Sequence, residues 1–123
     1  MFTSNLGFIL LFVANPSKSA EFYRNALGLK SIEESPTFVM FPLSNGVMLA
    51  LWSQYTAEPS VKSLSGAMEI GFSVEDVDLA YELFGKKGVT IIQKPTDMDF
   101  GRTFVFTDLD GHRIRIYKLN ENK

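Results

Sequence analysis

The chain contains no cysteine and only one histidine, His112, in its 123 residues. The lack of cysteine excludes a disulfide framework and thiolate metal sites. With a single histidine and no thiol, no Ser–His or Cys–His catalytic arrangement can be drawn. The residue types alone therefore predict no catalytic residues of these kinds.

The chain also lacks an excess of charge of one sign, because 12 basic and 14 acidic residues leave a net charge of −2. Without an excess of basic residues, we expect no nucleic-acid partner and no binding to an anionic membrane surface. No apolar run approaches the ~20 residues that span a bilayer. The run at residues 8–13 is short and has no basic residue before it, so we expect no signal peptide and a cytoplasmic protein.

Aromatic side chains are what the chain has in quantity: eleven Phe, four Tyr and one Trp. Hydrophobic residues make up 46% of the chain and charged residues 21%, as in an ordinary globular protein. The length suffices for one domain with its own core.

The first half reads as a strand, a helix and three further strands. Residues 6–13 form a near-continuous apolar run, which predicts a strand buried on both faces. Asn15 can cap a helix that begins at Pro16, and Gly28 stands where a left-handed C-terminal residue belongs. The three strands are expected over residues 30–34, 37–41 and 47–52.

The second half repeats this order after a polar linker over residues 55–66. It has a strand at 67–74, a helical stripe closed by Gly88, and strands at 90–94, 103–107 and 113–119. Residues 1–54 and 67–123 thus read as one supersecondary unit used twice. Since neither half can bury its sheet alone, we expect one α+β domain over residues 1–123. Two βαβββ modules would form a curved mixed sheet of about eight strands with a concave ligand cup.

Residues 100–117 predict two strands joined by a tight turn at 108–111, which offers a carboxylate and a glycine. The alternation after the turn places Ile114 and Ile116 on one face, which we interpret as core. The opposite face carries Arg113, Arg115 and Tyr117. A sheet face with such side chains is either exposed to solvent or lines a cavity.

This order of elements resembles the vicinal oxygen chelate superfamily of glyoxalase I, extradiol dioxygenases and bleomycin- or fosfomycin-resistance proteins. The resemblance rests on VANPSKS at 13–19, EFY at 21–23, LG at 27–28, VEDV at 74–77 and DLDG at 108–111. It implies a paired βαβββ fold and a homodimer, often with each cup built from halves of two subunits.

A narrower resemblance points to the phenazine-antibiotic resistance proteins of that superfamily. The similar segments are FP at 41–42, WS at 52–53, EIG at 69–71, DFGRTF at 99–104, DGH at 110–112 and IR at 114–115. This resemblance implies a small aromatic ligand.

Enzymes of the superfamily bind a metal through four side chains, and the resemblance carries these positions onto Phe8, Ala50, Glu69 and Arg115. Phe8 and Ala50 have no ligand atom, and Arg115 is a permanent cation. One carboxylate does not hold a catalytic metal, so we expect no metal and no cofactor. His112 is out of phase with Arg115 and should point away from the cup. We expect instead a Glu69–Arg115 ion pair, which either orients a polar or carboxylate-bearing ligand or is only a structural contact.

Strand alternation also predicts the lining of the cup: Phe8, Leu10, Phe12, Met48, Ala50, Trp52, Arg113 and Tyr117. Trp52 ends a strand beside a polar loop, and Tyr55 and Phe100 lie on loops that could close over a ligand. Planar heteroaromatic compounds suit such a surface, because they stack on aromatic rings and on arginine. The alternative is that these aromatic residues are ordinary core.

These features predict a metal-independent protein that sequesters a planar aromatic molecule, with a phenazine-type antibiotic as the leading candidate. The expected ligand-binding residues are Phe8, Phe12, Met48, Trp52, Tyr55, Glu69, Arg113, Arg115 and Tyr117. One alternative is a glyoxalase- or dioxygenase-type enzyme of the same superfamily, with or without metal. Another is a regulatory or interaction protein whose cup is filled by its own side chains.

Overall fold

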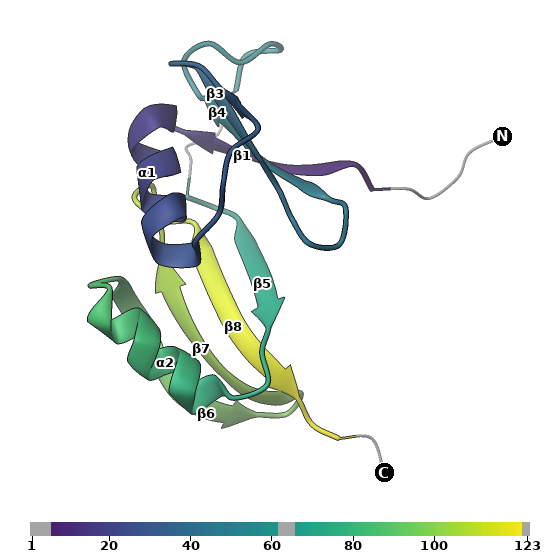
Figure 1. Ribbon diagram of the computed structural model, residues 1–123, viewed down its shortest axis with the longest axis vertical. Helices are drawn as coiled ribbons and strands as arrows, with labels where there is room; N and C mark the ends of the chain where they lie inside the picture. Colours follow the sequence, from purple (N-terminus) through teal and green to yellow (C-terminus); the bar gives the residue numbers. More distant parts are fainter. Residues whose placement is uncertain (1–5, 62–65, 122–123) are drawn as a thin grey trace, which may run out of the picture. The chain divides into compact units, whose positions relative to one another are not determined.

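The computed structural model describes residues 6–61 and 66–121 (Figure 1). The chain divides into two compact units, Met1–Ser65 and Gly66–Lys123. Within the described residues, each unit has the element order β-α-β-β-β. The predicted α+β class, with two βαβββ modules and eight strands, is confirmed. The strands form two four-stranded mixed sheets, one in each unit.

The first unit contains β1 (Phe8–Val13), α1 (Pro16–Leu27), β2 (Glu33–Glu34), β3 (Phe38–Pro42) and β4 (Met48–Ser53). The strand order is β1-β4-β3-β2, with β1 parallel to β4 and the other neighbours antiparallel. The helix begins as predicted, because the side chain of Asn15 accepts a hydrogen bond from the Lys18 N–H at 3.1 Å. It ends at Gly28, whose φ of 69° is left-handed.

α1 packs against one face of this sheet (Figure 1). Tyr23 on the helix is fully buried, and its ring centroid lies 6.4 Å from that of Phe41 on β3. The strand residues beneath the helix are buried as well: Leu11, Val13, Val39, Leu49 and Leu51. Each such side chain stabilises the fold by roughly 1.5–3 kcal/mol relative to its exposure.

The prediction that the first strand is buried on both faces is wrong. β1 is an edge strand, and Phe8 is 55% exposed. Leu11 and Val13 alternate with less buried residues, because α1 covers only one face of the sheet. The continuous apolar run therefore marks one core face and one face that is apolar without being covered by the helix.

The second unit contains β5 (Glu69–Ser73), α2 (Val77–Lys86), β6 (Thr90–Met98), β7 (Gly101–Thr107) and β8 (Arg113–Leu119). The strand order is β5-β8-β7-β6, with β5 parallel to β8 and the other neighbours antiparallel. Asp76 caps α2 by accepting a hydrogen bond from the Leu79 N–H at 3.0 Å. The C-cap of the helix is Lys87, and the predicted Gly88 follows it with a left-handed φ of 76°.

Aromatic rings form the core between α2 and its sheet. Phe104 and Phe106 on β7 are fully buried. Tyr81 meets Phe104 edge-on at 5.3 Å, and Phe84 lies 4.9 Å from Phe106, measured between ring centroids. Since these residues occupy the helix face of β7, the residues between them point to the other face.

β6 extends to Met98, well past the end predicted at residue 94. Pro95 concealed this continuation in the sequence, because proline is excluded from central strands. β6 is the edge strand, where proline is tolerated, and its pairing with β7 shifts register on both sides of Gln93. β7 likewise begins two residues earlier than predicted, at Gly101.

The predicted turn at 108–111 is confirmed. One carboxylate oxygen of Asp108 accepts hydrogen bonds from the N–H groups of Asp110 at 2.9 Å and His112 at 2.8 Å. Gly111 has a φ of 88°, the left-handed conformation for which glycine was expected.

The predicted linker 55–66 and the outer ends of the two predicted repeats extend beyond the described residues. Neither helix of the described ranges has the length and apolar character needed to cross a bilayer.

Gly101 is expected to be the glycine whose replacement costs the most. Its φ is 153°, and an added Cβ would clash with the carbonyl oxygen of Lys118 on β8. Gly101→Ala should therefore lower the free energy of unfolding by about 2 kcal/mol or more in urea titration. Gly85→Ala is the matched control, since its Cβ would meet nothing within 4 Å on α2. This change should be neutral or stabilise by about 0.5–1 kcal/mol. Equal stabilities for the two variants would contradict the claim that the backbone at position 101 requires glycine.

Candidate functional site

The sheet face of the first unit that lies opposite α1 carries aromatic and sulfur-containing side chains. Strand register places Phe8 beside Met48 and Phe12 beside Trp52 on the paired strands β1 and β4. These four predicted site residues are thus brought together on one face. We call this surface the aromatic face. It consists of Phe8, Leu10, Phe12, Phe38, Met40, Met48, Ala50 and Trp52.

Trp52 is held in position by two neighbouring rings. The ring of Phe12 lies 6.4 Å from the Trp52 ring, at an interplanar angle of 29°. The ring of Phe38 meets Trp52 edge-on, at 6.1 Å and 88°. Both geometries are favourable for aromatic pairs. The indole is therefore oriented by its neighbours while it remains partly exposed.

Two members of the aromatic face were missed by sequence reasoning. Phe38 pairs with Trp52, and Met40 pairs with Ala50, because β3 and β4 form an antiparallel hairpin. The signal was present in the alternation of residues 37–41, but assigning the face requires the register of the hairpin.

Tyr55, also predicted for the site, lies in the turn that follows β4 and is 75% exposed. Its N–H donates to the hydroxyl of Ser53 at 3.2 Å. Its ring meets no other ring among the described residues. A ligand contact by Tyr55 therefore stays a prediction.

The second unit holds a cluster of charged side chains on the face opposite α2. Glu69 on β5 pairs with Arg113 on β8, and Arg115 follows two residues later on the same face. Arg113 Nε lies 2.9 Å from Glu69 Oε1. Arg115 Nε lies 2.8 Å from Glu69 Oε2, and its Nη2 lies 3.4 Å from Oε1. The expected Glu69–Arg115 ion pair is present, and Arg113 joins it. We call these three residues the cationic cluster.

Arg115 is the more deeply held of the two arginines, with a side chain only 16% exposed. Its Nη1 donates to the Gln93 side-chain oxygen at 3.2 Å and to the Thr103 hydroxyl at 3.3 Å. The ring of Phe100 lies 5.9 Å from its guanidinium carbon, which is a cation–π distance. Gln93 was not predicted, because its place beside Arg115 depends on the irregular register of β6 and β7. Thr103 was not predicted, because its place depends on the register of β7 with β8, in which it pairs with Tyr117.

Tyr117 lies on the same face, one pleat further along β8. A Cβ added to Gly71 would come 3.2 Å from Cε1 of this tyrosine. The glycine therefore leaves room for the Tyr117 ring to lie against β5.

The side chains at the family's metal positions do not fit a metal ion. Phe8 and Ala50 offer no donor atom, and Arg115 is a cation. The fourth, Glu69, has both oxygens engaged by guanidinium groups. Among the described residues, no three His, Cys, Asp or Glu side chains are grouped in a way that could hold an ion.

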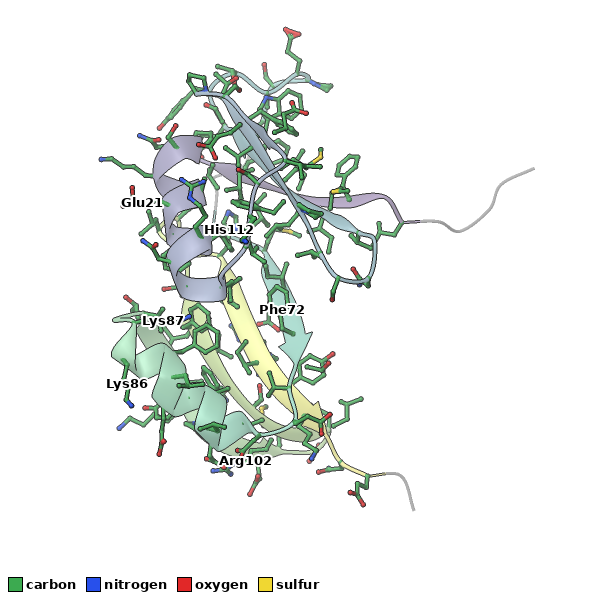
Figure 2. The ribbon with its side chains drawn as sticks, viewed as in Figure 1. Glu21, Phe72, Lys86, Lys87, Arg102 and His112 are labelled. Carbon is green, nitrogen blue, oxygen red and sulfur yellow. The ribbon has the colours of Figure 1, made fainter. Side chains whose placement is uncertain are left out.

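His112, labelled in Figure 2, is 2% exposed and packs within the second unit. Its Nε2 and Nδ1 each lie 3.3 Å from a backbone nitrogen, that of Gly66 and that of Met68. A neutral imidazole has one acceptor nitrogen, so it accepts one of these two N–H groups at a time. His112 thus ties the start of β5 to the turn before β8, which is a structural role.

Two βαβββ units in one chain are typical of one structural class of proteins. Comparison with known proteins assigns the chain to this class. The sequence profile of the Glyoxalase/Bleomycin resistance protein/Dioxygenase superfamily matches residues 5–116. The chain belongs to this superfamily.

Individual relatives are similar over most of their length. The phenazine antibiotic resistance protein EhpR of Enterobacter agglomerans is 33% identical over 90% of this chain and 89% of its own. The metallothiol transferase FosB of Staphylococcus haemolyticus is 33% identical over 85% of this chain and 76% of its own. The solution NMR structure of protein ATC0852 from Agrobacterium tumefaciens matches with a TM-score of 0.84 at 39% identity. It covers 97% of this chain and all of its own.

The ion pairs of Glu69 should make folding stability depend on pH. The hydrogen bond from Arg115, with the nearby charge of Arg113, lowers the pKa of Glu69 below its ordinary value of 4.5. Because the folded-state pKa is the lower one, the ionised carboxylate stabilises the fold above about pH 4.5. This contribution is lost as the pH falls through the lowered pKa.

Glu69→Gln should therefore lower the free energy of unfolding by about 1 kcal/mol near neutral pH, allowing for partial exposure of the carboxylate. Below about pH 4.5 the difference from the unaltered protein should shrink. Urea titrations at several pH values measure it. Glu82→Gln, an exposed glutamate of α2 with no ion pair among the described residues, is the control and should show neither effect. A difference between Glu69→Gln and the unaltered protein that is constant from pH 7 to about pH 3 would contradict the ion-pair account.

Proposed function

We propose that the chain is a metal-independent binding protein that sequesters a planar aromatic small molecule of the phenazine-antibiotic type, and so contributes to drug resistance. The observation that carries the proposal is the aromatic face, with Trp52 oriented by Phe12 and Phe38. The similarity to a phenazine antibiotic resistance protein, over nine-tenths of the chain, supports the ligand class.

The physical argument begins with stacking. A flat ring laid against an indole gains roughly 0.5–1.5 kcal/mol beyond the burial of its area. Trp52 is already oriented by its neighbours, so little side-chain freedom is lost on binding. Met48 and Met40 add flexible, polarisable contacts that adapt to substituents on the ring. These properties favour a class of flat molecules over one particular shape.

The predicted ligand contacts of the second unit are Glu69, Arg113, Arg115 and Tyr117, and they remain proposals, as does Tyr55 in the first. The homodimer and the cytoplasmic location implied earlier also remain predictions. The second candidate function is an enzyme of the same superfamily, which the similarity to a metallothiol transferase favours. The mismatch between the side chains at the metal positions and a metal ion argues against its metal-dependent form.

Binding can be followed through Trp52, because it is the only tryptophan of the chain. Titration with a panel of phenazines, naphthoquinones and anthracyclines should quench its fluorescence. Trp52→Ala should weaken binding by about threefold to tenfold, measured by isothermal titration calorimetry, because the stacking contribution is lost. Trp52→Phe should retain most of the affinity, since a ring remains at the position. Absence of quenching by every compound would overturn the proposal.

Two controls separate binding from its alternatives. Leu83→Ala removes an exposed apolar side chain of α2 and should leave the affinity unchanged. Chromatography of the ligand after long incubation should recover it unmodified, whereas a new product would identify an enzyme. Near-stoichiometric zinc, iron, nickel or manganese in purified protein would favour the metal-dependent enzyme.

A further inference from the structure

The two arginines of the cationic cluster differ in how many of their N–H groups are already used. A guanidinium carries five N–H groups and no acceptor. Arg115 directs four of its five to Glu69, Gln93 and Thr103. It is also the less exposed of the pair, at 16%. Arg115 therefore has almost no capacity left for a ligand.

Arg113 is in the opposite situation. Its Nε lies against Glu69 at 2.9 Å, and its side chain is 48% exposed. Neither terminal nitrogen has a hydrogen-bond or ion-pair partner in the part of the chain that the structure describes. The contact at Nε restrains the guanidinium on one side, and the four remaining N–H groups, on the two terminal nitrogens, form a fork that faces away from this contact. Such a fork matches the two oxygens of a carboxylate.

The charges of the cluster also leave Arg113 uncompensated. Glu69 carries one negative charge between two guanidiniums, and its strongest partner is Arg115, which binds it through two nitrogens. One positive charge is left over, and the exposed Arg113 presents it. Arg115 thus acts as a positioning residue: it holds the carboxylate that in turn holds Arg113.

We propose that Arg113 is the anion-binding residue of the second unit, and that its fork receives the carboxylate of a planar aromatic acid. This inference rests on the proposed function for its ligand class and adds the charge and the recognising residue. It predicts that a planar aromatic acid binds better than its neutral amide of the same shape.

The test compares phenazine-1-carboxylate with phenazine-1-carboxamide by isothermal titration calorimetry near pH 7. The acid should bind about tenfold tighter than the amide, as expected for charge-assisted hydrogen bonds in a partly exposed site. Arg113→Gln should reduce this preference to about twofold or less without changing the affinity for the amide. Arg113→Lys keeps the charge but not the fork, and should retain only part of the preference. Added salt should weaken the binding of the acid more than the binding of the amide.

Arg102→Gln is the matched control, because Arg102 lies in the same unit but pairs with Asp78 and Asp97 beside α2 (Figure 2). It should leave both affinities unchanged, and circular dichroism should show that each variant is folded. Equal binding of acid and amide, or a preference that survives in Arg113→Gln, would overturn the assignment of Arg113 and leave the proposed function standing. If neither compound nor any other member of the phenazine panel binds, the proposed function fails, and this inference fails with it.

Discussion

The carboxylate of Glu69, shared between the guanidinium groups of Arg113 and Arg115, is the interaction that organises the second unit's polar face. Charged groups on a sheet face are costly to remove from water unless they are paired. Glu69 meets this condition for two arginines at once, and Gln93 and Thr103 satisfy the rest of Arg115. A positive charge thus stands at a position that the resemblance to the superfamily assigned to a metal ligand.

The arrangement follows from the pleat of two parallel neighbours. β5 and β8 run side by side, so Glu69 and Arg113 are paired, and Arg115 is paired with a glycine. Gly71 leaves open space above β5, which the Tyr117 ring enters from the opposite strand. The long side chain of Arg115 reaches back to Glu69 on one side and across to Thr103 on the other. The carboxylate of Glu69 and the lack of a side chain at Gly71 therefore determine how the polar groups are arranged along this face.

The alternation of residue types along a strand predicted which face of the sheet a side chain occupies. It did not predict the register in which neighbouring strands pair. The residues of β8 and β4 could be assigned to core or open face from period-two patterns alone, since Ile114 and Leu51 are buried while Arg113 and Trp52 are not. Phe38 was missed because its side depends on how a hairpin pairs. Gln93 was missed because β6 shifts register twice. The burial of β1 was misjudged, because an apolar strand that serves an open face looks the same in sequence as one buried in a core.

The same contacts are the reason why we propose ligand binding, and not acid–base catalysis, for these side chains. A general base needs a pKa near the working pH, yet the pKa of Glu69 is lowered by its arginines. Arginine does not give up its proton, and His112 is buried against backbone groups. What remains is a set of oriented donors and rigid rings. A rigid ring such as Trp52 discriminates poorly among flat molecules, because stacking depends on area more than on substituents. A directional polar group discriminates better within such a class, and the terminal nitrogens of Arg113 have no hydrogen-bond or ion-pair partner among the described residues.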